Sequence, residues 1–352
     1  MGNPSDGYNG KCISLLISNF FVELTLTPNS YDNKAEEYKK INFRSPSSNK
    51  DCNLSFDSID TLIEISKNKG YDESNRLLQA TCKVFSEYCW KNDILLNQQG
   101  FSVHFITNIP RQVGLAGSSA IISAFWKALM LFFDVSNQII PLPIQANLIL
   151  SVERDELNIS AGLQDRVIQV YGGLIFMDFD EDHMIKHGVG MYERLDVNLL
   201  PKGFWIAFES NPSESDKIHN DVRKRYEAGD RKVIDAMKRF ASFAEQSRQI
   251  LIQNNRSKRN ELAKYMNKNF DLRREIFGDQ VLGQMNLRMI ELAREYNFAA
   301  KFTGSGGAIL GLWNEDDDDD DSIMFVNAEK LKRALEKEGF LFCWLNPKNE
   351  VL

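Results

Sequence analysis

The 352-residue sequence has no surplus of positive charge. It contains 42 lysines and arginines against 49 aspartates and glutamates, which gives a formal net charge of -7 at pH 7. A nucleic-acid-binding domain usually carries a strongly basic face. The charge balance therefore argues against nucleic acid and favours a small molecule as the partner.

Apolar runs of membrane-spanning length are also missing. The run at residues 121–133 contains Lys127 and falls short of the ~20 residues that a spanning helix needs. The start, Met1-Gly-Asn-Pro-Ser-Asp, is polar and does not resemble a secretory signal. We therefore expect no membrane partner.

Cysteine is scarce, and no two cysteines form a CxxC pair. The five are Cys12, Cys52, Cys82, Cys89 and Cys343. Free thiols in a reducing cytosol are the simplest account, so the sequence predicts a cytoplasmic protein. Cys82 and Cys89 lie seven apart in a helical pattern and are expected to be buried small side chains.

The most informative stretch is a glycine loop between a strand and a helix. Apolar and polar residues alternate over residues 101–107, and apolar residues recur at helical spacing over residues 121–133. The segment between them reads Pro110-Arg-Gln-Val-Gly-Leu-Ala-Gly-Ser-Ser-Ala120. Free backbone N–H groups at such a helix start suit a phosphate. An ordinary turn before a capped helix is equally consistent with this local pattern.

The loop is not a Walker A site. That motif places a lysine and a hydroxyl residue directly after its last glycine, whereas Gly117 is followed by Ser118, Ser119 and Ala120. If it binds phosphate, it does so by another arrangement.

The remaining pattern predicts a chain of mixed helices and strands. One or two strands are expected within residues 12–27, an exposed connection over 29–53, and helices over 58–67 and 72–90, the second capped by Asp72. Residues 213–296 are expected to be helical with breaks near Gly229, Asn254 and Gly278. A final helix over 327–339 and a strand over 340–344 follow an acidic run, 316–321, which we expect to be a solvated hairpin tip.

Two carboxylates could serve phosphoryl transfer. Glu153 lies twelve residues before Asp165, and the loop between them contains Gly162, so the two could converge. Magnesium bound to ATP needs only one or two protein oxygens, which Glu153 and the Ser119 hydroxyl could supply. A carboxylate near the attacking hydroxyl is also needed, and Asp165 is the candidate. A surface Glu153 and a helix-capping Asp165 remain the alternatives.

A second glycine-rich segment, Thr303-Gly-Ser-Gly-Gly307, follows a strand-like stretch. It does not have the GxGxxG spacing of a Rossmann fingerprint. A loop lining a ligand and a tight turn between strands are both consistent with it.

Three segments together resemble the ordered signatures of the GHMP small-molecule kinases. They are Gly2-Asn-Pro-Ser-Asp6, residues 110–120, and Lys301-Phe-Thr-Gly-Ser-Gly-Gly307. Longer stretches, among them Ala161-Gly-Leu-Gln-Asp-Arg-Val167 and Asn269-Phe-Asp-Leu-Arg-Arg274, are most similar to plant-type glucuronokinases. The resemblance implies an α+β fold of two lobes, a ribosomal-S5-like N-terminal lobe (1–195) and a ferredoxin-like C-terminal lobe (196–352).

The resemblance also implies an activity, namely ATP-dependent phosphorylation of the anomeric hydroxyl of D-glucuronate. Asp165 would face the sugar hydroxyl, and Ser119 and Glu153 would hold Mg2+. The ATP phosphates would contact Pro110, Gly114, Leu115, Ala116, Gly117, Ser118, Ser119 and Ala120. The sugar would contact Asp6, Gly304, Ser305, Gly306 and Gly307. The expected partners are a sugar acid and ATP, and the expected state is a monomer or weak homodimer.

The sugar carboxylate would need a cation, and a guanidinium suits it best. Our hypothesis is that Arg273 or Arg274 provides it, with Lys11 as a further candidate and solvated helix arginines as the alternative. Relatives usually carry a strand before the first signature. If the chain starts at Met1, an edge strand and a catalytic cation are expected to be missing.

Two other functions remain open. One is another GHMP sugar kinase, acting on a heptose, galacturonate or galactose. The other is a catalytically weak sugar-binding regulator on the same fold.

Overall fold

The computed structural model describes residues 1–30, 35–44, 53–210, 221–253, 257–315 and 321–350. The chain forms two compact units. Unit 1 comprises Met1–Asn19, Pro110–Leu115 and Gly172–Leu352, and unit 2 comprises Phe20–Ile109 and Ala116–Tyr171. Strand pairing joins residues 174–195 to the N-terminal segment in unit 1, and the expected lobe boundary after residue 195 stays a prediction.

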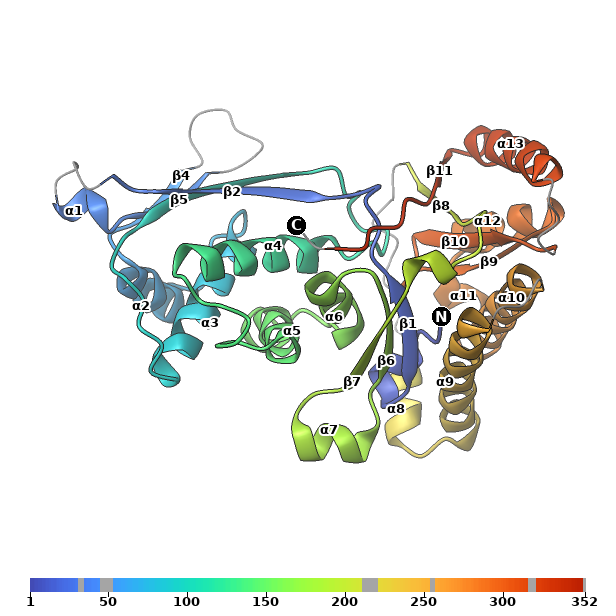
Figure 1. Cartoon of the computed structure of the whole chain (residues 1–352), viewed down its shortest axis with the longest axis horizontal. Coiled ribbons are helices and arrows are strands. Elements are labelled where there is room, and N and C mark those ends of the chain that lie inside the picture. Colours follow the sequence, from blue (N-terminus) through green and yellow to red (C-terminus); the bar gives the residue numbers. More distant parts are fainter. Residues whose placement is uncertain (31–34, 45–52, 211–220, 254–256, 316–320, 351–352) are drawn as a thin grey trace. The chain divides into compact units, whose positions relative to one another are not determined.

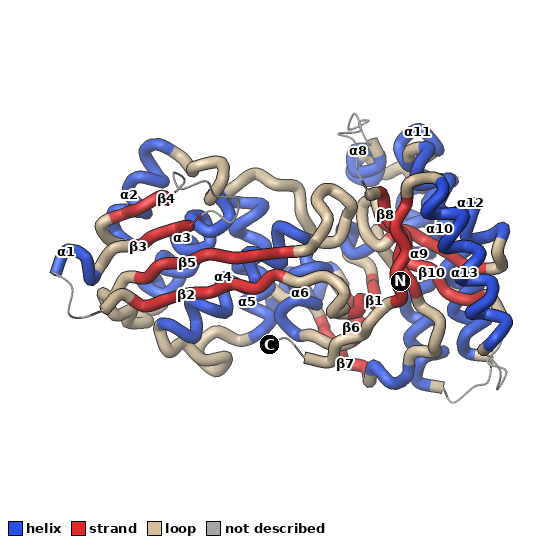
Figure 2. Tube along the Cα trace, turned by 90° about the horizontal axis from the view of Figure 1, so that it is seen from above, coloured by secondary structure: helices blue, strands red, loops and turns tan. Residues whose placement is uncertain are grey.

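Unit 2 is built on a four-stranded mixed sheet with the strand order β2-β5-β3-β4 (Figure 2). Its strands are β2 (Val22–Pro28), β3 (Ile41–Arg44), β4 (Asn53–Phe56) and β5 (Phe101–Thr107). β5 pairs antiparallel with β2 and parallel with β3, which pairs antiparallel with β4. The strand expected at residues 101–107 is confirmed.

Helices cover one face of this sheet (Figure 1). They are α2 (Ile59–Lys69), α3 (Arg76–Lys91), α4 (Gly117–Phe132), α5 (Leu142–Ser151) and α6 (Leu163–Tyr171), with the short α1 (Ala35–Tyr38) beside β3 in sequence. Alternate residues of β3 and β5 are buried, and aromatic side chains such as Phe43, Phe101 and Phe125 pack edge to face beneath them. Each of these rings removes a large apolar surface from water, which stabilises the unit.

Unit 1 contains two antiparallel sheets. The first has the order β1-β6-β7, from β1 (Lys11–Leu15), β6 (Leu174–Asp178) and β7 (Met191–Leu195). The second has the order β11-β8-β10-β9, from β8 (Trp205–Glu209), β9 (Phe298–Phe302), β10 (Ala308–Trp313) and β11 (Phe340–Trp344). The expected final strand at residues 340–344 is confirmed.

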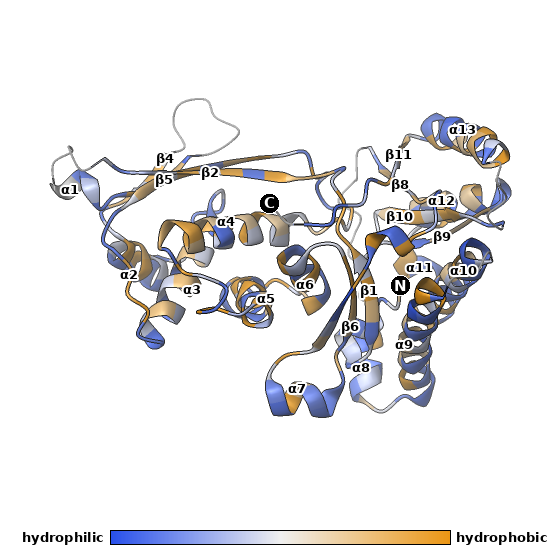
Figure 3. Cartoon of the chain, in the orientation of Figure 1, coloured by the Kyte–Doolittle hydropathy of each residue, from blue (hydrophilic) through white to orange (hydrophobic). Residues whose placement is uncertain are grey.

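The helices of unit 1 are mostly amphipathic. They are α7 (Glu181–His187), α8 (Val222–Glu227), α9 (Arg231–Ile252), α10 (Lys258–Phe277), α11 (Asp279–Leu282), α12 (Gln284–Glu295) and α13 (Ser322–Lys337), with 3-10 turns at Ser5–Tyr8 and Val197–Leu199. Hydrophobic and hydrophilic residues alternate along α9 and α10 in Figure 3, as expected for helices with one buried face. The expected helix breaks near Gly229 and Gly278 are confirmed, since both glycines have positive φ angles between helices.

Three local expectations differ from the structure. Residues 29–53 are not only a connection, because Ile41 and Phe43 of β3 are fully buried. The helix expected at residue 72 begins at Arg76, since the Asp72 carboxylate accepts from Asn75 in a preceding turn. The last helix begins five residues earlier than expected, at Ser322.

Other expectations concern the acidic run and the thiols. Residues 316–320 lie outside the described residues, and Asp321 pairs with Arg259 at 2.9 Å. Of the five cysteines, Cys52 lies outside the described residues, and the other four are free thiols as expected. Burial raises the pKa of both Cys82 and Cys89 to about 12, which makes them poor nucleophiles. Within the described part of the chain, no helix has the length and apolar character that crossing a membrane requires.

Candidate active site

The two glycine-rich segments meet in unit 1. Gly114 has a φ of 69°, and a side-chain Cβ there would lie 2.4 Å from the carbonyl oxygen of Gly306. A Cβ on Gly307 would lie 2.6 Å from the Cα of Val113. Backbone packs directly on backbone, so glycine is required at both contacts. The structure therefore brings residues 110–115 and 303–307 together.

Side chains outside the signatures fix the second glycine-rich segment. The Asn286 amide oxygen accepts from the Gly307 N–H at 2.8 Å. Thr303 Oγ1 lies 3.3 Å from the Gly114 carbonyl oxygen, to which it donates. Asn286 belongs to α12 and no sequence spacing pointed to it.

Residues 116–120, the second half of the expected phosphate loop, belong to unit 2. Ala116 adopts a left-handed conformation, with a φ of 56°, and α4 starts directly after it without a side-chain cap. Uncapped N–H groups at a helix start attract an anion, and the helix dipole adds to that attraction. Gln169 of α6 donates to the Ala116 carbonyl at 3.2 Å and so supports this turn. Phosphate binding at this helix start stays a prediction, which the absence of a side-chain cap at Ala116 favours.

Glu153 is the buried centre of the polar cluster in unit 2. It lies in a π-helical turn, Val152–Glu156, a geometry that is frequent at functional sites. Its side chain is 1% exposed, and its Oε1 accepts from the Ser118 hydroxyl at 2.6 Å. Its Oε2 accepts from Arg166, whose Nε lies 2.8 Å away and whose Nη2 makes a second, shorter contact. Glu153 is therefore not the surface carboxylate of the alternative interpretation.

The two neighbouring serines face different partners. Ser118 is hydrogen-bonded to Glu153, whereas the Ser119 hydroxyl donates to the Ala116 carbonyl at 3.0 Å and is fully buried. The structure thus brings Ser118 to Glu153 and leaves Ser119, the expected magnesium ligand, on the backbone of its own turn.

Asp165 is in the first turn of α6 and lies beside the same guanidinium. Its Oδ2 is 3.4 Å from Nη1 of Arg166, and 44% of its side chain is exposed. Both carboxylates contact Arg166, Glu153 at Nε and Nη2 and Asp165 at Nη1, and their expected joint role stays a prediction. Desolvation raises the pKa of Asp165 above its usual range; Arg166 opposes this shift and Glu153 adds to it. Arg166 was missed as a site residue, although its position next to Asp165 was visible.

The residues of unit 2 fit a magnesium ion that accompanies ATP. Among the described residues no three His, Cys, Asp or Glu side chains gather in a metal-binding cluster. A nucleotide-bound magnesium needs only one or two protein oxygens, however. Ser118 Oγ and Glu153 Oε1 offer two such oxygens in one buried place, with Arg166 compensating part of the carboxylate charge.

The first signature segment is bound to α10 in unit 1. Asn269 accepts from the Gly2 N–H and donates to the Asn3 carbonyl, both at 3.0 Å. Asn3 Nδ2 donates to the Asp6 carboxylate at 3.2 Å. Asp6 therefore lies in the 3-10 turn that α10 holds in place.

The three cationic side chains expected to bind a sugar carboxylate already interact with other protein groups in the structure. Arg273 is 6% exposed and donates to Asn3, Gly304 and Ser305. Arg274 forms two 2.7 Å hydrogen bonds with Asp279. Lys11 pairs with Asp178 and Glu245. None of the three presents a guanidinium or ammonium group without a protein partner.

Lys301 of the third signature is a second buried cation near Arg273. Its Nζ donates to the Phe302 carbonyl at 2.5 Å, and the side chain is 4% exposed. Burial, reinforced by repulsion from Arg273, lowers the pKa of Lys301 to about 7.

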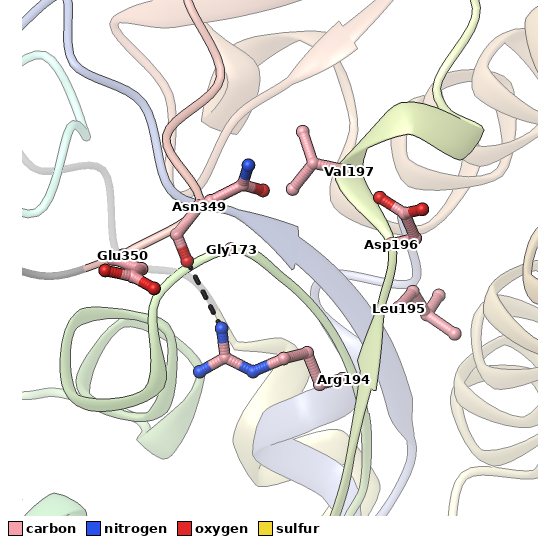
Figure 4. A pocket seen from close by; sticks show the side chains of 7 residues that line it. All are labelled: Gly173, Arg194, Leu195, Asp196, Val197, Asn349 and Glu350. Carbon is pink, nitrogen blue, oxygen red and sulfur yellow. Dashed lines mark hydrogen bonds between the residues drawn. The ribbon is translucent and has the colours of Figure 1, made fainter.

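A pocket of about 450 Å3 lies elsewhere in unit 1 (Figure 4). It is lined by Gly173, Arg194, Leu195, Asp196, Val197, Asn349 and Glu350. Arg194 donates across it to the Asn349 carbonyl at 3.2 Å. No signature residue lines this pocket, so we do not assign it to the candidate active site.

Comparisons with known proteins identify relatives of this chain. Residues 76–173 match the family model described as "GHMP kinases N terminal domain". The chain is similar to "Glucuronokinase 1" of Arabidopsis thaliana, with 47% identity over 88% of this chain and 81% of the relative. It is more distantly similar to the D-glycero-alpha-D-manno-heptose 7-phosphate kinase of Campylobacter jejuni, with 27% identity over 66% of this chain and 60% of that protein.

Solved structures agree in fold. The chain is similar to Lactococcus lactis galactokinase complexed with galactose, with a TM-score of 0.74 at 14% identity, over 99% of this chain and 90% of that one. The expected α+β kinase fold is therefore confirmed. By its 47% identity to a glucuronokinase over 88% of this chain and its match to the N-terminal family model, the chain belongs to the GHMP kinase superfamily, on the glucuronokinase-like branch.

Proposed function

We propose that the protein phosphorylates the anomeric hydroxyl of D-glucuronate with ATP, giving glucuronate 1-phosphate. The observation that supports phosphoryl transfer is the shared contact of Glu153 and Asp165 with Arg166, in the unit that also carries the uncapped start of α4. The choice of sugar follows the glucuronokinase to which the chain is 47% identical.

Each group of residues is assigned a role that matches its chemistry. The N–H groups at the start of α4 bind phosphate oxygens of ATP, together with the backbone of residues 110–116. Mg2+, held by Ser118 and Glu153, would neutralise charge on the phosphates. Asp6 and residues 304–307 bind the sugar.

Asp165 orients the sugar hydroxyl and accepts its proton. The hydroxyl oxygen forms a bond to the γ-phosphorus while the bond to the ADP oxygen breaks, and the proton moves to the carboxylate. A raised pKa suits a group that must take up a proton in this step.

A substrate panel tests the proposal. Purified protein with Mg-ATP is expected to release ADP fastest with D-glucuronate, and 31P NMR is expected to show a phosphate on the anomeric carbon. Faster turnover of a heptose, galacturonate or galactose would replace the proposed substrate. Sugar binding without turnover of any panel member would favour the sugar-binding regulator instead.

Arg223 is our candidate for the contact with the sugar carboxylate. Its guanidinium lies 5.3 Å from the ring centroid of Tyr8, and its Nη1 donates to the Gly7 carbonyl at 2.5 Å, directly after Asp6. Like Arg274, Arg223 has a carboxylate partner, since its Nε pairs with Glu227, but it lies next to the first signature and its side chain is 60% exposed. An exposed guanidinium beside the first signature can receive a carboxylate.

Replacing Arg223 with alanine is therefore expected to raise the KM for D-glucuronate by about tenfold, which corresponds to ~1.4 kcal/mol. The Ki of D-glucuronamide, which has the same shape without the charge, should stay within about twofold. Lys224→Ala removes an exposed cation from the same helix and serves as the control. Equal losses for the acid and the amide would show that Arg223 does not contact the carboxylate.

A further inference from the structure

We propose that Arg273 is a positioning residue, which fixes the first signature segment against the turn of the third signature so that both meet the sugar in one geometry. The inference rests on the proposed function, because it assigns Asp6 and residues 304–307 to the sugar. It replaces the hypothesis that Arg273 itself binds the sugar carboxylate.

The guanidinium joins two segments that lie about 300 residues apart in sequence. Its Nη1 donates to the Asn3 side-chain oxygen and to the Gly304 carbonyl, each at 2.8 Å, and its Nη2 donates to the Ser305 carbonyl at 3.3 Å. The planar fork of an arginine can hold three acceptors on different chain segments at once, whereas a lysine ammonium cannot reproduce that geometry.

Asn269 acts with Arg273 on the same side of α10. The two residues are four apart, so they lie one above the other on the helix surface. Asn269 holds the backbone of Gly2 and Asn3, while Arg273 holds the Asn3 side chain and the third signature. The helix therefore acts as a rigid support for both segments.

Two aromatic rings lie close to the guanidinium. Its carbon lies 5.2 Å from the ring centroid of Phe277 and 5.1 Å from that of Phe302. Cation–π contacts of this kind strengthen when the cation is shielded from water. Phe302 directly precedes the third signature turn, so this cation–π contact also influences where that turn lies.

The positively charged Arg273 interacts electrostatically with Asp6 of the first signature. Burial lowers the pKa of Arg273 to about 10, and attraction to Asp6 opposes that shift. The side chain thus remains charged at neutral pH. It attracts Asp6, and both of its terminal nitrogens donate to protein oxygens, while its buried Nε has no hydrogen-bond partner among the described residues.

Arg273→Lys is the test. It keeps the charge but removes the fork, and a displacement near 1 Å in a substrate-binding segment can cost about a hundredfold in rate. We expect kcat/KM for D-glucuronate to fall by between about tenfold and a hundredfold. The Ki of the uncharged D-glucuronamide and the Ki of an unreactive glucuronate analogue should rise by the same factor. Arg274→Ala, which removes the neighbouring arginine and its surface pair with Asp279, should change each value by less than about twofold.

Two results would overturn the inference. A loss confined to acid ligands would mean that Arg273 contacts the carboxylate, and unchanged kinetics in Arg273→Lys would mean that the fork has no positioning role. Should Arg273→Lys fail to fold, Asn3→Ala keeps the arginine and removes one acceptor of the fork together with the hydrogen bond from Asn3 to Asp6. It should lower kcat/KM in the same pattern, and unaltered kinetics would refute the proposal. If the substrate panel selects another sugar, the same comparison is made with that sugar and a close analogue, so that failure of the proposed function is separate from failure of this inference.

Discussion

Asp165→Asn is expected to lower kcat by about a hundredfold to ten-thousandfold, the range that a positioned proton acceptor contributes. Asparagine keeps the size of the side chain but cannot accept the proton of the sugar hydroxyl. The KM for ATP should change little, because the proposed phosphate contacts of α4 remain. Steady-state kinetics with ATP and D-glucuronate measure both constants.

The pH dependence gives a second readout of Asp165. The carboxylate must be ionised to accept a proton, so kcat/KM is expected to fall as the pH drops through its raised pKa. This acid limb should lie at higher pH than for an ordinary aspartate and should be absent in the asparagine variant. Asp155→Asn is the matched control, since Asp155 is an exposed carboxylate paired with Arg154. If Asp165→Asn retained more than about a tenth of the wild-type kcat, the assignment of Asp165 would be wrong.

Glu153→Ala is expected to lower the free energy of unfolding by about 3–5 kcal/mol, because it leaves a buried arginine without its main counter-charge. Arg166 is 5% exposed and keeps the more distant Asp165 carboxylate and the Gly162 carbonyl as partners. The Ser118 hydroxyl loses its acceptor at the same time. Denaturant unfolding measures this change.

Matched variants separate the buried charge from the functional role of Glu153. Asp155→Ala breaks an exposed pair and should cost less than about 1 kcal/mol. Glu153→Leu combined with Arg166→Leu removes both charges and should recover most of the lost stability without recovering activity. A loss below about 1 kcal/mol in Glu153→Ala would contradict the buried pair.

The sequence predicts most of the helices and strands because each depends on the periodicity of its apolar residues. The alternation at residues 101–107 and the helical spacing after Gly117 predicted β5 and α4, and the third signature was identified from its glycines. β3 was missed since two buried residues, Ile41 and Phe43, are too few to establish a period of two.

The choice between Ser118 and Ser119 could not be made from the sequence. Successive residues in a helix point about 100° apart, so only one of two adjacent serines can face a given carboxylate. Which one does so depends on the left-handed turn at Ala116 and on where the π-helical turn brings Glu153.

The sequence by itself determined the family, the order of the three signatures and the residue types of the chemistry, because motifs and periodicity are local properties of the chain. Tertiary structure alone decided the partners: Ser118 with Glu153, Arg166 between two carboxylates, and Arg273 on backbone carbonyls instead of a ligand. A hydrogen bond or ion pair between segments distant in sequence requires a direction as well as a residue type, and direction is fixed only when the elements pack.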